Sequence, residues 1–142
     1  MKTYTRNLFI LLLLVMMAIT SCEIAEDEPG SDDPRDKMTG TWQFSENSVK
    51  STRSISYTVN ITKDPDNSSQ VILENLGNPG SFDIQSSGIV TSSQIVVSEQ
   101  TLSNGWVIEG SGKLVSSGTM NWTYSLIAGG DIEEYTAVAT KL

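Results

Sequence analysis

Apolar side chains recur at every second position over most of this chain, and this period of two restricts the fold more than any other feature. In the stretches 55–61 and 120–126, apolar or aromatic residues alternate strictly with Ser, Thr or Asn. Successive side chains of a β-strand point to opposite faces, so the pattern predicts half-buried strands. No stretch after residue 22 has helical spacing. The pattern therefore predicts an all-β fold.

Turn-forming residues divide the region 38–142 into eight predicted strands. Gly, Ser, Asn, Asp and Pro gather in short segments that suit hairpin loops. The strands are predicted at residues 40–46, 54–63, 69–76, 81–91, 94–99, 106–115, 118–127 and 132–141. Because the connections are short, we expect a single antiparallel meander. Closure of that meander into a small barrel would leave no sheet edge exposed.

The beginning of the chain has the order of an export signal that ends at a cysteine. Two basic residues precede an uncharged apolar run, residues 8–19, which is too short to cross a bilayer. An aliphatic residue, two small residues and Cys22 follow, and this sequence resembles the lipobox of bacterial lipoproteins. We therefore expect residues 1–21 to be a cleaved signal peptide and Cys22 to be the site of lipid attachment.

The cysteine count supports lipidation at Cys22. It is the single cysteine of the chain, so it cannot form an internal disulfide in an exported protein. Two or more acyl chains on one residue are sufficient for stable membrane anchoring. The alternative is an ordinary secretory signal followed by an incidental cysteine.

Residues 22–37 are expected to form a disordered, acidic tether between the lipid and the domain. Seven acids, two prolines and one glycine lie in this segment, which has little apolar surface with which to fold. Acidic residues directly behind a lipidated cysteine resemble the surface-export signals of Bacteroidota lipoproteins. The expected location is the outer membrane, facing either the cell surface or the periplasm.

The composition argues against several functions. The formal net charge is −8 with no basic cluster, which disfavours nucleic acid as a partner. With no histidine and its one cysteine acylated, the chain lacks the groups for His-based or Cys-based catalysis and for zinc binding. The acidic segment 64–67 lacks the spacing of a calcium loop and is interpreted as a turn. We therefore expect no enzyme activity, no metal and no cofactor.

Several short motifs resemble those of small lipocalin-like (calycin-like) lipoproteins of Bacteroidota. They are Gly40-Thr41-Trp42 in the first strand, Gly110-Ser111-Gly112, Trp122-Thr123-Tyr124, Tyr135-Thr136-Ala137 and the final Thr140-Lys141. The resemblance covers residues 38–142 and implies an eight-stranded barrel in which Trp42 closes one end. In lipocalins an arginine near the last strand packs across that tryptophan, and Lys141 is the cation available here.

The aromatic side chains are the candidates for binding. Trp106 follows a Ser-Asn-Gly loop and could lie at a barrel mouth, while Trp122 and Tyr124 alternate within one strand, where core packing is the common role of aromatics. Trp42, Tyr57 and Tyr135 are further candidates. An eight-stranded barrel can be filled by its own side chains or can hold a small ligand. The possible partners are therefore a small apolar ligand or glycan, or another envelope protein that contacts a filled barrel.

Overall fold

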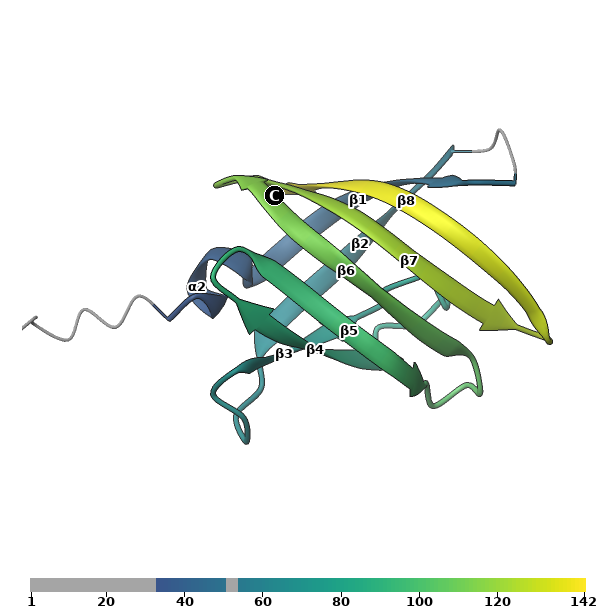
Figure 1. Ribbon diagram of the computed structural model, residues 1–142, viewed down its shortest axis with the longest axis horizontal. Coiled ribbons are helices and arrows are strands. Elements are labelled where there is room, and N and C mark those ends of the chain that lie inside the picture. The colour runs from purple at the N-terminus through teal and green to yellow at the C-terminus, as the bar shows by residue number, and fades with distance from the viewer. Residues whose placement is uncertain (1–32, 51–53) are drawn as a thin grey trace, which may run out of the picture. The chain divides into compact units, whose positions relative to one another are not determined.

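In the computed structural model, eight strands form one closed barrel (Figure 1). The structure describes residues 33–50 and 54–142, so the expected signal peptide and Cys22 lie outside the described residues. The elements are α2 (Arg35–Met38), β1 (Gly40–Ser48), β2 (Ser54–Lys63), β3 (Gln70–Glu74), β4 (Gln85–Thr91), β5 (Gln94–Thr101), β6 (Val107–Ser116), β7 (Thr119–Ala128) and β8 (Asp131–Lys141). In the part of the chain that the structure describes, no helix is long and apolar enough to span a membrane.

The strands pair in sequence order, each antiparallel to the next. The first and last strands also pair, with Trp42 opposite Val59 of β2 on one side and opposite Lys141 of β8 on the other. Closure gives every strand two neighbours, so no strand presents an unpaired edge. The predicted all-β fold, an eight-stranded antiparallel meander closed into a small barrel, is confirmed.

The predicted strands agree with the structure except at a few ends. The fourth strand begins at Gln85 rather than at residue 81, because residues 75–84 turn twice through backbone hydrogen bonds from Asn78 to Asn75 and from Ile84 to Ser81. The fifth strand continues past residue 99 through a bulge between Val97 and Gln100. Turn residues mark where strands separate, but a bulge leaves no clear signal in the sequence.

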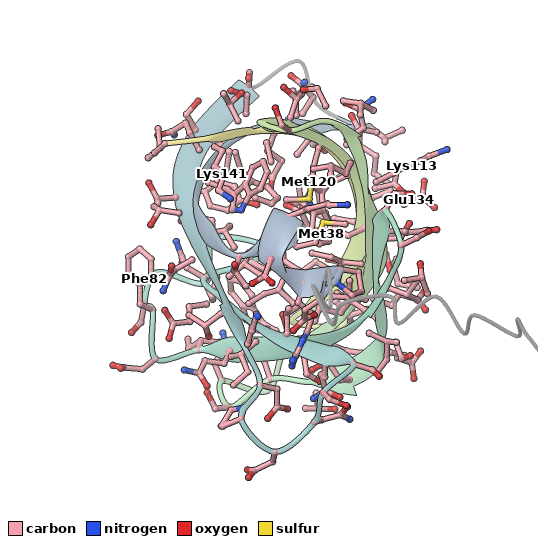
Figure 2. The ribbon with its side chains drawn as sticks, turned by 90° about the vertical axis from the view of Figure 1, so that its left-hand side faces the viewer. Met38, Phe82, Lys113, Met120, Glu134 and Lys141 are labelled. Carbon is pink, nitrogen blue, oxygen red and sulfur yellow. The ribbon has the colours of Figure 1, made fainter. Side chains whose placement is uncertain are left out.

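The helix α2 corrects the sequence prediction, which assigned residues 33–37 to the disordered tether. This four-residue helix lies across one end of the barrel, as Figure 2 shows when the barrel is viewed from that end. Met38 at its end is fully buried and points toward Met120 inside the ring of strands. The ordered domain therefore begins before residue 38, and a single helical turn is too short to show amphipathic spacing.

Charged contacts hold α2 against the β2–β3 loop. The Arg35 guanidinium bonds the Asp33 carboxylate and donates to the backbone carbonyls of Asp64, Asn67 and Gln70 at 2.9–3.3 Å. Lys63 of β2 forms ion pairs with Asp33 and with Asp36. Hydrogen bonds from Arg35 and Lys63 hold the pKa of the Asp33 carboxyl well below its usual value. The acidic segment that precedes the barrel therefore ends in ion pairs and hydrogen bonds that fix α2 to β2 and the β2–β3 loop.

The Gly-x-Trp motif builds the closed end. Trp42 is fully buried, and its indole Nε1 donates to the carbonyl of Met38 at 2.8 Å. The Lys141 ammonium lies 5.5 Å from the centre of the Trp42 ring, within cation–π range. Gly40 has φ +125°, and a Cβ there would lie 2.9 Å from the Lys141 side chain. A glycine at this position therefore lets the lysine cover the tryptophan.

The middle of the barrel is filled by side chains. Trp122 of β7 is 1% exposed and packs 5.6 Å from Phe44 of β1, measured between ring centres. Its indole covers Gly112 of β6, where a Cβ would lie only 2.1 Å from the ring. A missing side chain on one strand thus makes room for the largest side chain on the next. Gly112 therefore accommodates an aromatic ring, and the strand register shifts between Val97 and Gln100 and between Leu114 and Ser116.

This close fit predicts that Gly112→Ala destabilises the domain by about 2 kcal/mol or more, because the added methyl group overlaps the Trp122 ring and the core must shift. Gly118→Ala is the matched control, since nothing lies within 4 Å of a Cβ at that position in the β6–β7 turn. The control should change stability by less than about 0.5 kcal/mol. Urea unfolding of both variants measures the difference, and equal stabilities would contradict the packing of Trp122 over Gly112.

Candidate functional site

The end of the barrel opposite α2 carries a pocket. Its cavity volume is ≈ 310 Å³, near the lower limit of small-molecule sites. The pocket is lined by Glu46, Ile55, Gly77, Asn78, Trp106, Leu126, Ala128, Glu133 and Tyr135. These residues come from four strands and two loops, so only closure of the barrel brings them together. We call this pocket the mouth pocket.

Glu46 of β1 supplies the buried charge of the mouth pocket. It follows Trp42 and Phe44 on the inward face of the strand and is 4% exposed. The Tyr57 hydroxyl donates to Oε2 of Glu46 at 2.9 Å and lies 2.9 Å from the Tyr124 hydroxyl. A phenol has one hydrogen to donate, so Tyr124 donates to Tyr57 while Tyr57 donates to Glu46. Two tyrosines in series thus support one carboxylate.

The surroundings of Glu46 favour its neutral form. Burial raises the pKa of the Glu46 carboxyl, the Tyr57 hydrogen bond opposes that rise, and the negative charge of Glu133 adds to it. Burial and the nearby Glu46 charge raise the pKa of the Tyr57 hydroxyl far above its usual value. The Tyr57 hydrogen bond therefore holds the carboxylate in place but, among the described residues, does not offset the effect of burial.

Tyr135 of β8 connects the buried part of the mouth pocket to its rim. Its ring stacks on Tyr124 with 5.2 Å between ring centres, and its hydroxyl donates to the Glu133 carboxylate. Burial, with the Glu133 hydrogen bond, raises the pKa of Tyr135 to about 12. Glu133 lines the mouth pocket while Glu134 lies on the outer wall, as expected for sequence neighbours in a strand.

Trp106 lies at the rim, in the loop between β5 and β6. The loop is fixed by a hydrogen bond from the Leu102 N–H to the Trp106 carbonyl at 2.7 Å and by one from the Trp106 N–H to the Asn104 side chain at 3.1 Å. The indole is partly buried against the core and partly exposed in the mouth pocket. It is therefore a fixed aromatic surface that solvent can reach.

The predicted binding residues separate into three places. Trp106 lines the mouth pocket, and Tyr124 lies beneath it as part of the tyrosine pair. Trp122 lies in the filled core and is not among the residues that line this pocket, while Trp42 lies under the α2 end. Sequence reasoning missed Glu46, although the alternation Trp42, Phe44, Glu46 puts a charged residue on the inward face. That interruption of the apolar pattern was the available signal.

A larger hollow of ≈ 630 Å³ lies on the outer wall over β5 to β8 and is wide open to solvent. Its lining mixes short polar residues such as Ser111 and Thr123 with valines and with the exposed Glu109 and Glu134. Among the described residues, no three acidic side chains come close enough together to hold a metal ion. The mouth pocket combines burial, aromatic rings and a charged group, so it is the stronger candidate site.

Comparison with solved structures finds the same fold in designed proteins. A redesigned β-barrel matches with a TM-score of 0.57 at 12% identity, covering 78% of this chain and 96% of that one. A redesigned barrel solved with bound DFHBI, mFAP1, matches with a TM-score of 0.55 at 10% identity, covering 77% and 99%. A fluorescence-activating barrel designed de novo gives 0.52 at 19%, covering 78% and 98%. No protein-family model matches the chain, and no curated protein matches it in sequence.

These comparisons define the class of protein. The chain forms an all-β, eight-stranded antiparallel meander closed into a small barrel, like designed lipocalin-like barrels. At these low identities the likeness concerns the fold alone. The role of the barrel depends on the residues of its own pocket.

The raised pKa of Glu46 predicts that Glu46→Gln stabilises the domain at pH 7. Because the pKa of Glu46 is higher in the folded state, its carboxyl stabilises the fold fully only below the unfolded pKa of about 4.3. This stabilisation is lost as the pH rises through the raised pKa of the folded state. Glutamine keeps an oxygen that can accept from Tyr57. We expect a gain of about 1 kcal/mol at pH 7, or roughly 4 °C in Tm, that disappears near pH 4.

Thermal unfolding at both pH values measures this difference. Glu109→Gln removes the same charge from the exposed outer wall and should change stability by less than about 0.5 kcal/mol. A Glu46→Gln effect of equal size at pH 4 and pH 7 would contradict the assignment.

Proposed function

We propose that the barrel is a binding module that holds a small apolar molecule or a glycan in its mouth pocket. This proposal rests on the lining of that pocket, which combines the Trp106 indole, apolar walls from Ile55 and Leu126, and the buried Glu46 carboxyl. A flat indole buries a large area against a sugar or an apolar ring with little loss of side-chain entropy. A barrel of the same fold has been solved with bound DFHBI, which supports ligand binding as a use of this architecture.

We also propose that Cys22 anchors the protein to the outer membrane, facing the cell surface or the periplasm, as the resemblance of the motifs to lipocalin-like lipoproteins of Bacteroidota implies. The lipobox-like sequence and the acidic segment after it support this role. The chain enters the barrel at α2, and the mouth pocket lies at the opposite end. A tether attached at the closed end leaves the open end free to face away from the membrane.

We propose a non-catalytic role. The sequence has no histidine, and of the two carboxylates that line the mouth pocket only Glu46 is buried. Glu133 is exposed and accepts a hydrogen bond from Tyr135. A pair of catalytic carboxylates would need both groups held toward one cleft with different proton affinities.

A second candidate function is that of an accessory protein that contacts another envelope protein. The filled interior around Trp122 and the open hollow on the outer wall favour it, because a solid barrel can act only through its surface. The exposed apolar side chains of that hollow are Val49 and Val96, and Val96 lies opposite the similarly exposed Ile89 of β4. Their area is small for a stable protein interface.

The ligand proposal predicts that a small molecule co-purifies with the protein from its own host and is detected by native mass spectrometry. Trp106→Ala should abolish that signal or reduce it roughly tenfold, because the rim loses its stacking surface. Val115→Ala, an exposed residue near the closed end, is the control and should retain the ligand. Binding unchanged by Trp106→Ala would exclude the mouth pocket as the site.

The anchoring proposal predicts that Cys22→Ala abolishes acylation and releases the protein from the membrane fraction, because the thioether to the lipid can no longer form. Mass spectrometry of the mature N-terminus and fractionation of cell membranes measure the two effects. Ser21→Ala keeps a small residue before the cysteine and serves as the control, which should remain lipidated. A Cys22→Ala protein that still fractionates with membranes would contradict the anchor.

A further inference from the structure

We propose that the ligand of the mouth pocket is a small organic cation, in which an ammonium group is attached to an apolar or sugar-like body. This inference rests on the proposed binding function and specifies the chemistry of the ligand. It follows from the charge, the hydrogen bonding and the aromatic surface of one pocket.

Glu46 accepts a hydrogen bond on one of its two carboxylate oxygens. Its Oε2 accepts from Tyr57, and that hydroxyl is in turn supported by Tyr124. No hydrogen bond to Oε1 comes from the described residues, and Oε1 is not one of the fully enclosed unpartnered atoms, so it faces the mouth pocket that Glu46 lines. A carboxylate oxygen that faces a largely enclosed pocket forms its strongest hydrogen bonds with charged donors. An ammonium group in the pocket would be such a donor.

The described lining of the mouth pocket is negatively charged. Two carboxylates, Glu46 and Glu133, line it, and no lysine or arginine lines it within residues 33–50 and 54–142. Lys50 lies near the rim, where its Nζ donates to the carbonyl of Ile132 at 2.8 Å. Removing water from carboxylates that have no cation beside them is strongly unfavourable. A cationic ligand would bring positive charge to a lining in which the described residues place none, whereas an anionic ligand would add to the repulsion.

The mouth pocket also carries an aromatic surface. Trp106 and Tyr135 line the same pocket as Glu46, and Tyr135 stacks on Tyr124. Aromatic faces attract cations, and their apolar area can hold the rest of the molecule. The volume of ≈ 310 Å³ restricts the ligand to a small molecule of about one ring and a short chain.

These contacts also explain why a residue that lowers stability occupies the floor of the pocket. Burial of the Glu46 carboxyl and the nearby charge of Glu133 work against folding at neutral pH, and the opposite end of the same β1 strand carries Trp42 at an equivalent inward position. Binding sites commonly retain groups of this kind because function requires them. A neutral apolar ligand would leave the Glu46 charge without a partner.

Three probes of similar size separate the charge from the apolar body: 2-phenylethylamine, 2-phenylethanol and 3-phenylpropionate. Their affinities for the mature chain, residues 22–142 with Cys22→Ala to prevent acylation, can be measured by isothermal titration calorimetry at pH 7. We expect the amine to bind about tenfold tighter than the alcohol, as a charge-assisted hydrogen bond to Glu46 would give, and the propionate to bind weakest.

Substitutions then assign the preference to Glu46. Glu46→Gln should remove the tenfold preference for the amine while leaving the affinity for the alcohol within about twofold. Glu109→Gln, which changes the net charge equally on the outer wall, should keep the preference. If Glu46→Gln does not fold, Glu133→Gln at the rim should reduce the preference by a smaller factor.

Two results would overturn the inference, and they are distinct. Equal or tighter binding of the alcohol, unaffected by Glu46→Gln, would reject the cationic ligand while leaving a ligand site at the mouth. Absence of binding by all three probes, together with absence of a co-purifying molecule from the host, would reject the proposed function itself.

Discussion

The pairing of β1 with β8 is the interaction on which the rest of the structure depends. It satisfies the backbone groups of both outer strands and turns an open sheet into a barrel with an inside and an outside. It also brings Lys141 to Trp42 at one end and Tyr135 to Ser48, beyond Glu46, at the other. Without this pairing neither the closed end nor the mouth pocket would exist.

The two ends of the barrel use the same inward positions for different purposes. At the α2 end, Met38 and Trp42 fill the interior completely, and the one polar atom of the indole finds a backbone acceptor. At the other end, Glu46 takes the equivalent inward position and accepts a hydrogen bond from Tyr57. At the α2 end, close packing provides stability. At the mouth pocket, open space beside a buried carboxylate makes a binding site possible.

The sequence predicted the fold well because a period of two is local information. Each strand displays it independently, so eight strands and their order followed without knowledge of contacts. Glu46 was missed because a single acid in an apolar run has no partner that sequence spacing can identify. Its hydrogen-bond partner Tyr57 lies 11 positions away on the neighbouring strand, and Tyr124, which donates to Tyr57, lies 67 positions further along the chain. The α2 turn was assigned to the tether because its acids form ion pairs with Lys63, a contact that composition does not reveal.

Lipid attachment at Cys22 stays a prediction. By itself, the sequence determined the all-β class and the number and order of the strands. Each of these depends on residues that are close together in the chain. The tertiary structure decided which end of the barrel is closed, which aromatic side chains are core and which lie at a rim, and where the buried carboxylate lies. These features depend on closure, because only a completed ring of strands brings β1, β2, β7 and β8 around one enclosed volume.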